Sequence, residues 1–162
     1  MGAALVSSDN GAAFAYPMVV DEEMSHFADS MNMLASELGM VQSEFVDSAG
    51  IYDENITTAR DLTRASIAAA FHPTVSIPAA SSVWYAEIGE EDKVYRTTNR
   101  SNGRADFLLA KTGFTYTARA NFTAVYQEKD GRQIAFTILG AWTPSRRSKD
   151  VRKIMDWVRR HP

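Results

Sequence analysis

Two short motifs in this sequence carry side chains that could take part in acyl transfer. Ser8-Asp9-Asn10 lies near the start of the chain, and Lys111-Thr112-Gly113 lies in a strand-like stretch further on. Both are elements of one type of serine acyl-enzyme site, whose third element is a Ser-x-x-Lys that carries the nucleophile. No serine stands three positions before any of the five lysines, so that third element is absent from these 162 residues.

Each residue of the second motif has a use at such a site. A strand would hold Lys111 rigidly, so that its ammonium group could bias the charge of a neighbouring Ser/Lys pair, and the Thr112 hydroxyl could bind a substrate carboxylate. Gly113 leaves room for a peptide along the strand edge, and the backbone N–H of Phe114 could face a developing oxyanion. Read alone, the triplet also fits a plain surface strand, and Ser8-Asp9-Asn10 fits a helix N-cap.

The bulk properties set limits on the class of protein. A chain of 162 residues is long enough for one domain with a hydrophobic core. Its net charge of -3 gives no reason to expect a nucleic-acid partner, and its three histidines have no ligand spacing that would predict a metal site or metal cofactor. Cysteine is absent, which does not select a compartment. No apolar run is long enough to span a membrane, and residues 1–6 lack the basic region of a signal peptide.

The first part of the chain is expected to be helical. Apolar residues recur at helical spacing over residues 24–38, and Gly39 is a suitable C-cap. A loop is expected over residues 40–55. Thr58 and Asp61 have capping-box spacing at the start of a helix that should run to residue 71 and stop before Pro73.

The pattern then changes to strands. Strands are expected at 83–88, 93–98, 107–112, 117–126 and 133–139, and the last two should form a hairpin through Lys129-Asp130-Gly131. An apolar stripe from Val151 to Val158 predicts a closing helix. Helices, a β-meander and a final helix predict an α+β, three-layer domain over residues 1–162, with a helical part at 1–75 and a sheet part at 80–162.

Over nearly all of its length the chain resembles the low-molecular-weight penicillin-binding proteins. These are serine-type D-alanyl-D-alanine carboxypeptidases and endopeptidases that trim peptidoglycan. The resemblance is carried by an ordered series: Ser8-Asp9-Asn10-Gly11-Ala12-Ala13, Met31-Asn32, Leu38-Gly39-Met40, Phe45, Gly50, Thr57-Thr58-Ala59-Arg60-Asp61-Leu62, Thr98-Asn99, Lys111-Thr112-Gly113-Phe114-Thr115, Leu139-Gly140 and Met155-Asp156-Trp157. The Thr-Ala-Arg-Asp-Leu and Lys-Thr-Gly-Phe-Thr forms look most like the endopeptidases.

The resemblance implies catalytic roles for three residues. Ser8 would relay protons between the absent nucleophile and the leaving amine. Asn10 would hold the amide of the substrate and the absent lysine. Lys111 would line the opposite wall of the cleft. No cofactor is implied.

The resemblance also implies substrate-binding roles. Thr112 and Arg147 would hold the terminal D-alanine carboxylate. Arg147 is chosen because it stands ten residues before Trp157, as the family's carboxylate-binding arginine would, and Arg146 is the alternative. Gly113 would lie along the peptide, and the N–H of Phe114 would form half of the oxyanion hole. The substrate would be a peptidoglycan stem peptide ending in D-Ala-D-Ala, in the periplasm or cell envelope.

The chain departs from the family pattern in three ways, the first of which is that the segment from Arg100 to Ala110 looks short. Arg119 stands where the family usually has glycine, which would alter strand packing or the mouth of the cleft. The N-terminal part, with two strands and the nucleophile helix, is also missing, so the chain should be the C-terminal part of a truncated transpeptidase-like domain, with residues 133–139 exposed as a strand edge. The chain alone is expected to be inactive and to form no covalent penicillin adduct; β-lactams should bind only if the missing part is supplied.

Two other interpretations remain open. The chain could be a non-catalytic module that binds peptidoglycan peptides or another protein, or it could be an unrelated α+β domain with coincidental motifs.

Overall fold

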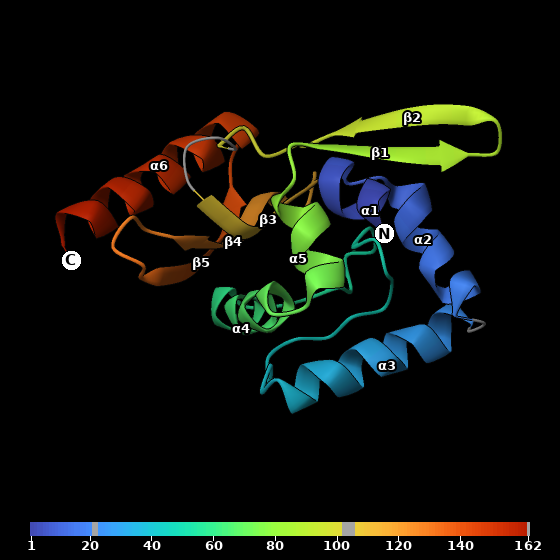
Figure 1. The fold of residues 1–162 in the computed structure, drawn as a ribbon. Helices are drawn as coiled ribbons and strands as arrows, with labels where there is room; N and C mark the ends of the chain where they lie inside the picture. The colour runs from blue at the N-terminus through green and yellow to red at the C-terminus, as the bar shows by residue number, and fades with distance from the viewer. Residues whose placement is uncertain (21–22, 102–105, 162) are drawn as a thin grey trace.

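The computed structural model of the chain describes residues 1–20, 23–101 and 106–161. Helices come first, two antiparallel sheets follow, and a long helix closes the chain (Figure 1). This confirms the predicted α+β fold class.

The first half of the chain forms five helices. They are α1 (Gly2–Ser7), α2 (Asn10–Val19), α3 (Met24–Glu37), α4 (Ala59–Ala70) and α5 (Pro73–Ala80). The two helices predicted from periodicity and caps are confirmed within one or two residues. Gly39 follows α3 with a φ of 70°, a left-handed conformation that suits glycine. The Thr58 side chain caps α4 by accepting a hydrogen bond from the Asp61 N–H at 3.2 Å.

No helix is predicted after Pro73, yet α5 begins at that residue. Proline is favourable in the first turn, where its missing N–H would have no helical partner. Pro78 is also inside this short helix, near its end. The residues of α5 are small or apolar on several sides, so no single stripe identifies the helix, and it packs between α1 and the sheet.

The main sheet has three antiparallel strands in the order β3 (Asp106–Thr115), β4 (Arg119–Gln127) and β5 (Gln133–Ala141). The hairpin between β4 and β5 turns as predicted: the Glu128 N–H donates to the Arg132 carbonyl at 2.8 Å, and Gly131 has a φ of 87°. The strand with the Lys-Thr-Gly motif is longer than predicted, because it pairs with β4 as far as Thr115.

Among the described residues, the hairpin of β1 (Val83–Ile88) and β2 (Glu91–Arg96) forms a second sheet, separate from the β3–β4–β5 meander, a separation that the strand pattern alone does not predict. Figure 1 shows this hairpin extending away from the main sheet. Its turn is Gly89-Glu90, with Gly89 at a φ of 65°, and the second strand therefore begins and ends two residues earlier than predicted.

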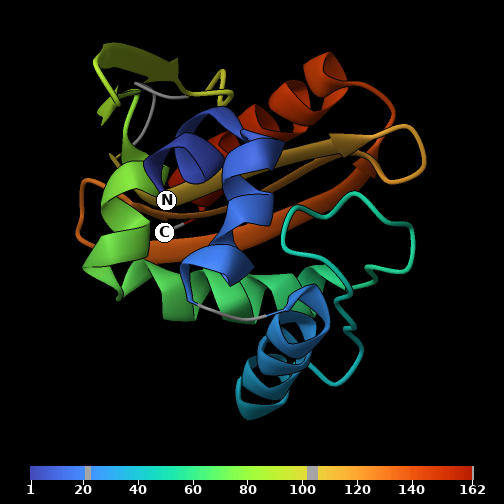
Figure 2. The same cartoon turned by 90° about the vertical axis from the view of Figure 1, so that its right-hand side faces the viewer.

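The main sheet lies between two layers of helices (Figures 1 and 2). On one face, α6 (Pro144–Arg160) brings Val151 and Met155 against Phe107, Phe122 and Tyr126. The other face packs against α4 and α5 through a second apolar cluster around Ala79, Leu109 and Val125. The sheet is therefore fixed from both sides.

A chain of side-chain hydroxyls also ties α4 to the sheet. Thr63 contacts Thr137 at 2.8 Å, Thr137 contacts Thr123 at 2.9 Å, and Thr123 contacts Ser66 in the next turn of α4. Because Ser66 and Thr123 are buried, these contacts give their hydroxyls the partners that burial demands.

Strand β5 is the last strand of the main sheet, and its outer edge pairs with no other strand in the part of the chain that the structure describes. The strand contains no charged residue or proline, the devices that commonly protect an edge. The predicted edge is therefore unpaired among these residues. Among the same described residues, no helix is long and apolar enough to cross a membrane.

Replacing Phe122 tests the core. The Phe122 side chain is 2% exposed and contacts aromatic rings on β3 and β5, so Phe122→Ala leaves a cavity between the sheet and α6. We expect the free energy of unfolding, measured by urea denaturation, to fall by about 3–5 kcal/mol. Tyr116→Ala is the control, because Tyr116 is 95% exposed, and its effect should stay within about 0.5 kcal/mol. Equal effects of the two substitutions would contradict this packing.

Candidate active site

A cleft of ≈ 750 Å³ lies between the helical part and the main sheet. It brings together all seven residues predicted for the site: Ser8, Asn10, Lys111, Thr112, Gly113, Phe114 and Arg147. They come from three segments far apart in the sequence, namely the α1–α2 junction, β3 and α6. The cleft is also lined by residues that were not predicted, some of them from the loop over residues 47–55.

Ser8 occupies the sharp junction between α1 and α2. It has a φ of 58° and a ψ of 43°, a left-handed conformation that costs a non-glycine residue about 1–2 kcal/mol. The conformation lets α1 end and α2 begin within two residues, while the Asp9 carboxylate caps α2 by accepting from the Ala12 N–H at 2.8 Å. The helix-cap interpretation of this motif is therefore correct for Asp9. Ser8 and Asn10, on either side of Asp9, line the cleft.

Lys111 reaches across the cleft from β3. Its Nζ donates hydrogen bonds to Ser8 Oγ and, at 2.7 Å, to the Thr112 carbonyl. No carboxylate forms an ion pair with it among the described residues. Burial and the neighbouring Arg147 charge lower the pKa of Lys111 to about 8, because both disfavour the ammonium form.

Thr112 and Phe114 lie on the same strand in different environments. The Thr112 side chain is nearly buried, and its hydroxyl contacts the Thr98 hydroxyl at 2.5 Å. The Phe114 side chain is half exposed and packs edge-on against Tyr116. Between them, Gly113 leaves the strand surface uncovered where it borders the cleft.

Arg147 enters the cleft from the first turns of α6. Its guanidinium is buried and donates to the carbonyls of Asn121 at 3.3 Å and Gly113 at 3.5 Å. Burial, and then the charge of Arg100, lower the pKa of Arg147. Arg146, the alternative arginine, is exposed and does not line this cleft.

One wall of the cleft is a loop folded around a buried carboxylate. The Asp47 side chain is 3% exposed and accepts hydrogen bonds from the N–H groups of residues 49–52 and from the Asn55 amide. These donors lower the pKa of Asp47 despite its burial. The loop presents Gly50 and Ile51 to the cleft, and Asp53 accepts from the Thr117 hydroxyl at 3.1 Å, joining the loop to the β3–β4 turn.

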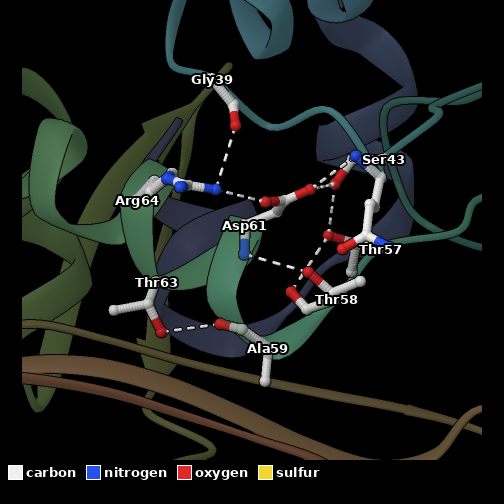
Figure 3. Close-up of polar contacts among 9 residues, drawn as sticks. Gly39, Ser43, Thr57, Thr58, Ala59, Asp61, Thr63 and Arg64 are labelled. Carbon is white, nitrogen blue, oxygen red and sulfur yellow. Dashed lines mark hydrogen bonds and ion pairs between the residues drawn. The ribbon is translucent and has the colours of Figure 1, made fainter.

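A second buried carboxylate, Asp61, lies on α4 and anchors the first part of the long loop between α3 and α4, which also contains residues 47–55 (Figure 3). It accepts from the Gln42 N–H at 2.8 Å and the Ser43 hydroxyl at 3.1 Å, and it pairs with Arg64 at 2.7 Å. The predicted capping box is therefore only half formed: Thr58 caps the helix, but the Asp61 carboxylate holds the preceding loop. The hydrogen bonds and the Arg64 charge lower the pKa of Asp61.

Arg119, the departure from the family pattern, lies outside the cleft lining. It has a φ of 61°, and its guanidinium carbon lies 3.3 Å from the centre of the Trp142 ring. This cation–π contact directs the bulky side chain toward the start of α6. The substitution is thus accommodated without filling the cleft.

Some lining residues were not predicted: Ala49, Gly50, Ile51, Thr97, Thr98, Arg100, Thr115, Ala118, Asn121 and Pro144. Gly50 and Thr98 belong to the ordered motif series, but their types alone indicate no chemistry. Gly50 reaches the site only because the loop over residues 47–55 folds against the cleft, and Thr98, which follows β2, reaches it through its contact with Thr112.

The arrangement can bind an anionic peptide end and transfer protons beside it. Arg147, Arg100 and Lys111 place positive charge in the cleft, and no carboxylate lines it among the described residues. The Ser8 hydroxyl and the Lys111 amine are hydrogen-bonded to each other, so they are close enough for proton transfer.

Lys111 should make the fold less stable at neutral pH. Its pKa falls from 10.5 in the unfolded chain to about 8 in the folded protein, so burial disfavours the charged form. That cost is fully present below pH 8 and disappears as the pH rises to 10.5. At pH 7, Lys111→Met should therefore raise the free energy of unfolding by about 1–3 kcal/mol, measured by urea denaturation. Lys129→Met, in the exposed β4–β5 turn, is the control and should change little; a Lys111→Met variant less stable than the wild type would contradict the expectation.

Comparison with known proteins identifies the family of the chain. The family model for D-alanyl-D-alanine carboxypeptidases matches residues 1–143. A D-alanyl-D-alanine endopeptidase of Escherichia coli K12 is 27% identical over 159 residues, covering 96% of this chain and 51% of that protein. Another, from Pseudomonas aeruginosa, is 32% identical over 116 residues, covering 69% of this chain and 37% of that protein. The chain therefore spans about half the length of the E. coli relative.

A solved structure gives the same result for the fold. Penicillin-binding protein D2 from Listeria monocytogenes, in its cefotaxime-bound form, superimposes with a TM-score of 0.83 at 27% identity, over 96% of this chain and 63% of that chain. With the family model matching most of its residues, the chain belongs to the D-alanyl-D-alanine carboxypeptidase family, the low-molecular-weight penicillin-binding proteins.

Proposed function

We propose that this chain carries the substrate cleft of a serine-type D-alanyl-D-alanine peptidase of the cell envelope. The proposed ligand is a peptidoglycan stem peptide that ends in D-Ala-D-Ala. The observation that carries the proposal is the contact of Lys111 with Ser8 across a cleft that also holds Thr112 and Arg147.

In this proposal the cleft binds the peptide by its carboxylate. Arg147 supplies the charge, and the Thr112 hydroxyl supplies a neutral donor beside it. A charge-assisted hydrogen bond in a partly buried cleft is stronger than one between neutral groups. The bound peptide would lie along β3, where Gly113 has no side chain to obstruct it.

The catalytic roles follow from the positions of the remaining residues. Ser8 and Lys111 would transfer a proton to the leaving D-alanine, Asn10 would hold the peptide amide, and the Phe114 N–H would stabilise the oxyanion. Formation of the acyl-enzyme requires the serine of a Ser-x-x-Lys element, which does not occur in these 162 residues. We therefore expect peptide binding without release of D-alanine by this chain alone.

We propose that the complete site also carries out endopeptidase cleavage, within a cross-linked peptide as well as at a terminal D-alanine. Both relatives described above are D-alanyl-D-alanine endopeptidases, and the Thr-Ala-Arg-Asp-Leu sequence at residues 58–62 supports this second reaction.

A non-catalytic module is the second candidate. The unpaired, uncharged edge of β5 favours it, because an edge of this kind readily accepts another strand. Such a module could still bind the stem peptide through Thr112 and Arg147, so pairing at the β5 edge is what separates it from the first candidate. Light scattering that shows a monomer at high protein concentration would count against the module.

Removing the Arg147 charge tests the proposed carboxylate site. Calorimetric titration with an N-acyl-D-Ala-D-Ala peptide should show binding that Arg147→Gln weakens about tenfold or more, because a hydrogen bond to a charged group is lost. The peptide with an amidated C-terminus should show a similar loss with the wild-type protein.

Arg146→Gln is the matched control, since Arg146 is the exposed neighbour of Arg147 outside the cleft. It should bind the acid as the wild type does. Equal affinity for the acid and the amide would refute the carboxylate site, and a loss confined to Arg146→Gln would move that site to the neighbouring arginine.

A further inference from the structure

We propose that Ser8 and Lys111 form a serine–lysine nucleophile pair of their own, which accepts an acyl or phosphonyl group from small activated electrophiles. This activity goes beyond the proposed peptidase function, in which Ser8 only relays protons. It requires neither a bound D-Ala-D-Ala peptide nor a Ser-x-x-Lys element.

The contact between the two side chains is the first support. Lys111 Nζ and Ser8 Oγ are hydrogen-bonded although they stand on opposite walls of the cleft. A serine hydroxyl becomes nucleophilic when an adjacent base removes its proton, and a neutral lysine amine is one of the bases that serve this purpose. In the structure Lys111 Nζ is the donor of this bond; once the amine is neutral, the same two atoms are placed for the Ser8 hydroxyl to pass its proton to Nζ.

The backbone of Ser8 is the second support. Its left-handed conformation is strained for serine and is set by the abrupt start of α2. Ser8 is half-buried and lines the open cleft, so an electrophile can reach its hydroxyl. Asn10, the first residue of α2, is exposed in the same cleft and offers an amide donor for the developing negative charge.

The charges that face Lys111 favour its neutral form. Arg147 faces it from α6, and Arg100 lies beyond Arg147 in the cleft; no carboxylate lines the cleft among the described residues. With a pKa of about 8, a sizeable fraction of Lys111 is neutral in mildly alkaline solution. An amine of this kind can act as the base.

The step is balanced without another reactant. With a fluorophosphonate, Ser8 Oγ attacks phosphorus and forms a P–O bond, while the P–F bond breaks and fluoride leaves with its electron pair. The Ser8 hydroxyl proton passes to neutral Lys111, which becomes an ammonium. With an activated ester, Ser8 Oγ forms the new C–O bond, and the alkoxide or phenolate leaves.

Small electrophiles without a carboxylate are the expected substrates. A penicillin or a stem peptide carries a carboxylate that Thr112 and Arg147 would bind, which fixes where its carbonyl lies. A small uncharged reagent is not held in this way and is free to approach Ser8. The proposal is therefore consistent with the expectation that penicillin leaves this chain unlabelled.

Labelling with a fluorescent fluorophosphonate tests the pair. The 162-residue chain should be labelled, and mass spectrometry should locate the adduct on Ser8. The labelling rate should rise about tenfold per pH unit below the Lys111 pKa of about 8 and level off above it, because the neutral amine is the base. This profile distinguishes a base from a group with only a structural role.

Four variants make the test specific. Ser8→Gly removes the hydroxyl in a residue that tolerates the φ of 58°, and it should abolish the label. Lys111→Met, and equally Lys111→Arg, whose guanidinium keeps its proton, should slow labelling about 100-fold. Ser7→Ala is the matched control, because the Ser7 hydroxyl is bonded to the Ala3 carbonyl within α1, and it should label at the wild-type rate. Circular dichroism should show that every variant is folded.

Several results would overturn the proposal. They are the absence of a label on the folded wild-type chain, an adduct on another residue, full labelling of folded Ser8→Gly, or a rate that does not change between pH 6 and 9. A failure here leaves the peptide-binding proposal standing, because that proposal is tested by affinity for the D-Ala-D-Ala carboxylate.

Discussion

The site depends on one buried cation held against a hydroxyl across the cleft. Lys111 has no ion-pair partner among the described residues, so hydrogen bonds to Ser8 and to the Thr112 carbonyl are what offset its burial. A lysine placed in this way lowers stability, and the fold tolerates it because the strand on which it stands is fixed from both faces. The burial that lowers the stability of the fold also lowers the pKa of Lys111 to about 8, so its amine can lose its proton in mildly alkaline solution.

The opposite wall is held by polar contacts instead of packing. Asp47 and Asp61 are buried carboxylates whose acceptor oxygens are filled by backbone N–H groups, hydroxyls and an arginine. A loop built on such contacts keeps a fixed shape without secondary structure. It presents Gly50 and Ile51 to the cleft at a fixed position relative to Lys111. The rigid sheet and the pinned loop together position side chains that are far apart in the sequence.

The sequence predicts the local features of this structure and misses those that depend on distant contacts. The Lys-Thr-Gly strand, the hairpin at Gly131 and the cap at Thr58 follow from residue type and spacing, and all are found. Helix α5 is missed because its prolines resemble stop signals, and the Asp61 contact is missed because its partners lie 18–19 residues earlier. Ordered motifs identified the family and predicted residues that line one cleft, but only the fold brings the loop at residues 49–51 to that cleft.

The most direct test of this account is the ionisation of Lys111 itself. Carbon-13 NMR of lysine-labelled protein, with the Lys111 Cε signal assigned from its absence in Lys111→Met, gives the midpoint of its titration. We expect a midpoint of about 8, and in a Ser8→Gly variant, which lacks the contact, the chemical-shift change on titration should be smaller than in the wild type. A midpoint near 10.5, the ordinary value for lysine, would show that Lys111 is not buried against Ser8 and would contradict the account.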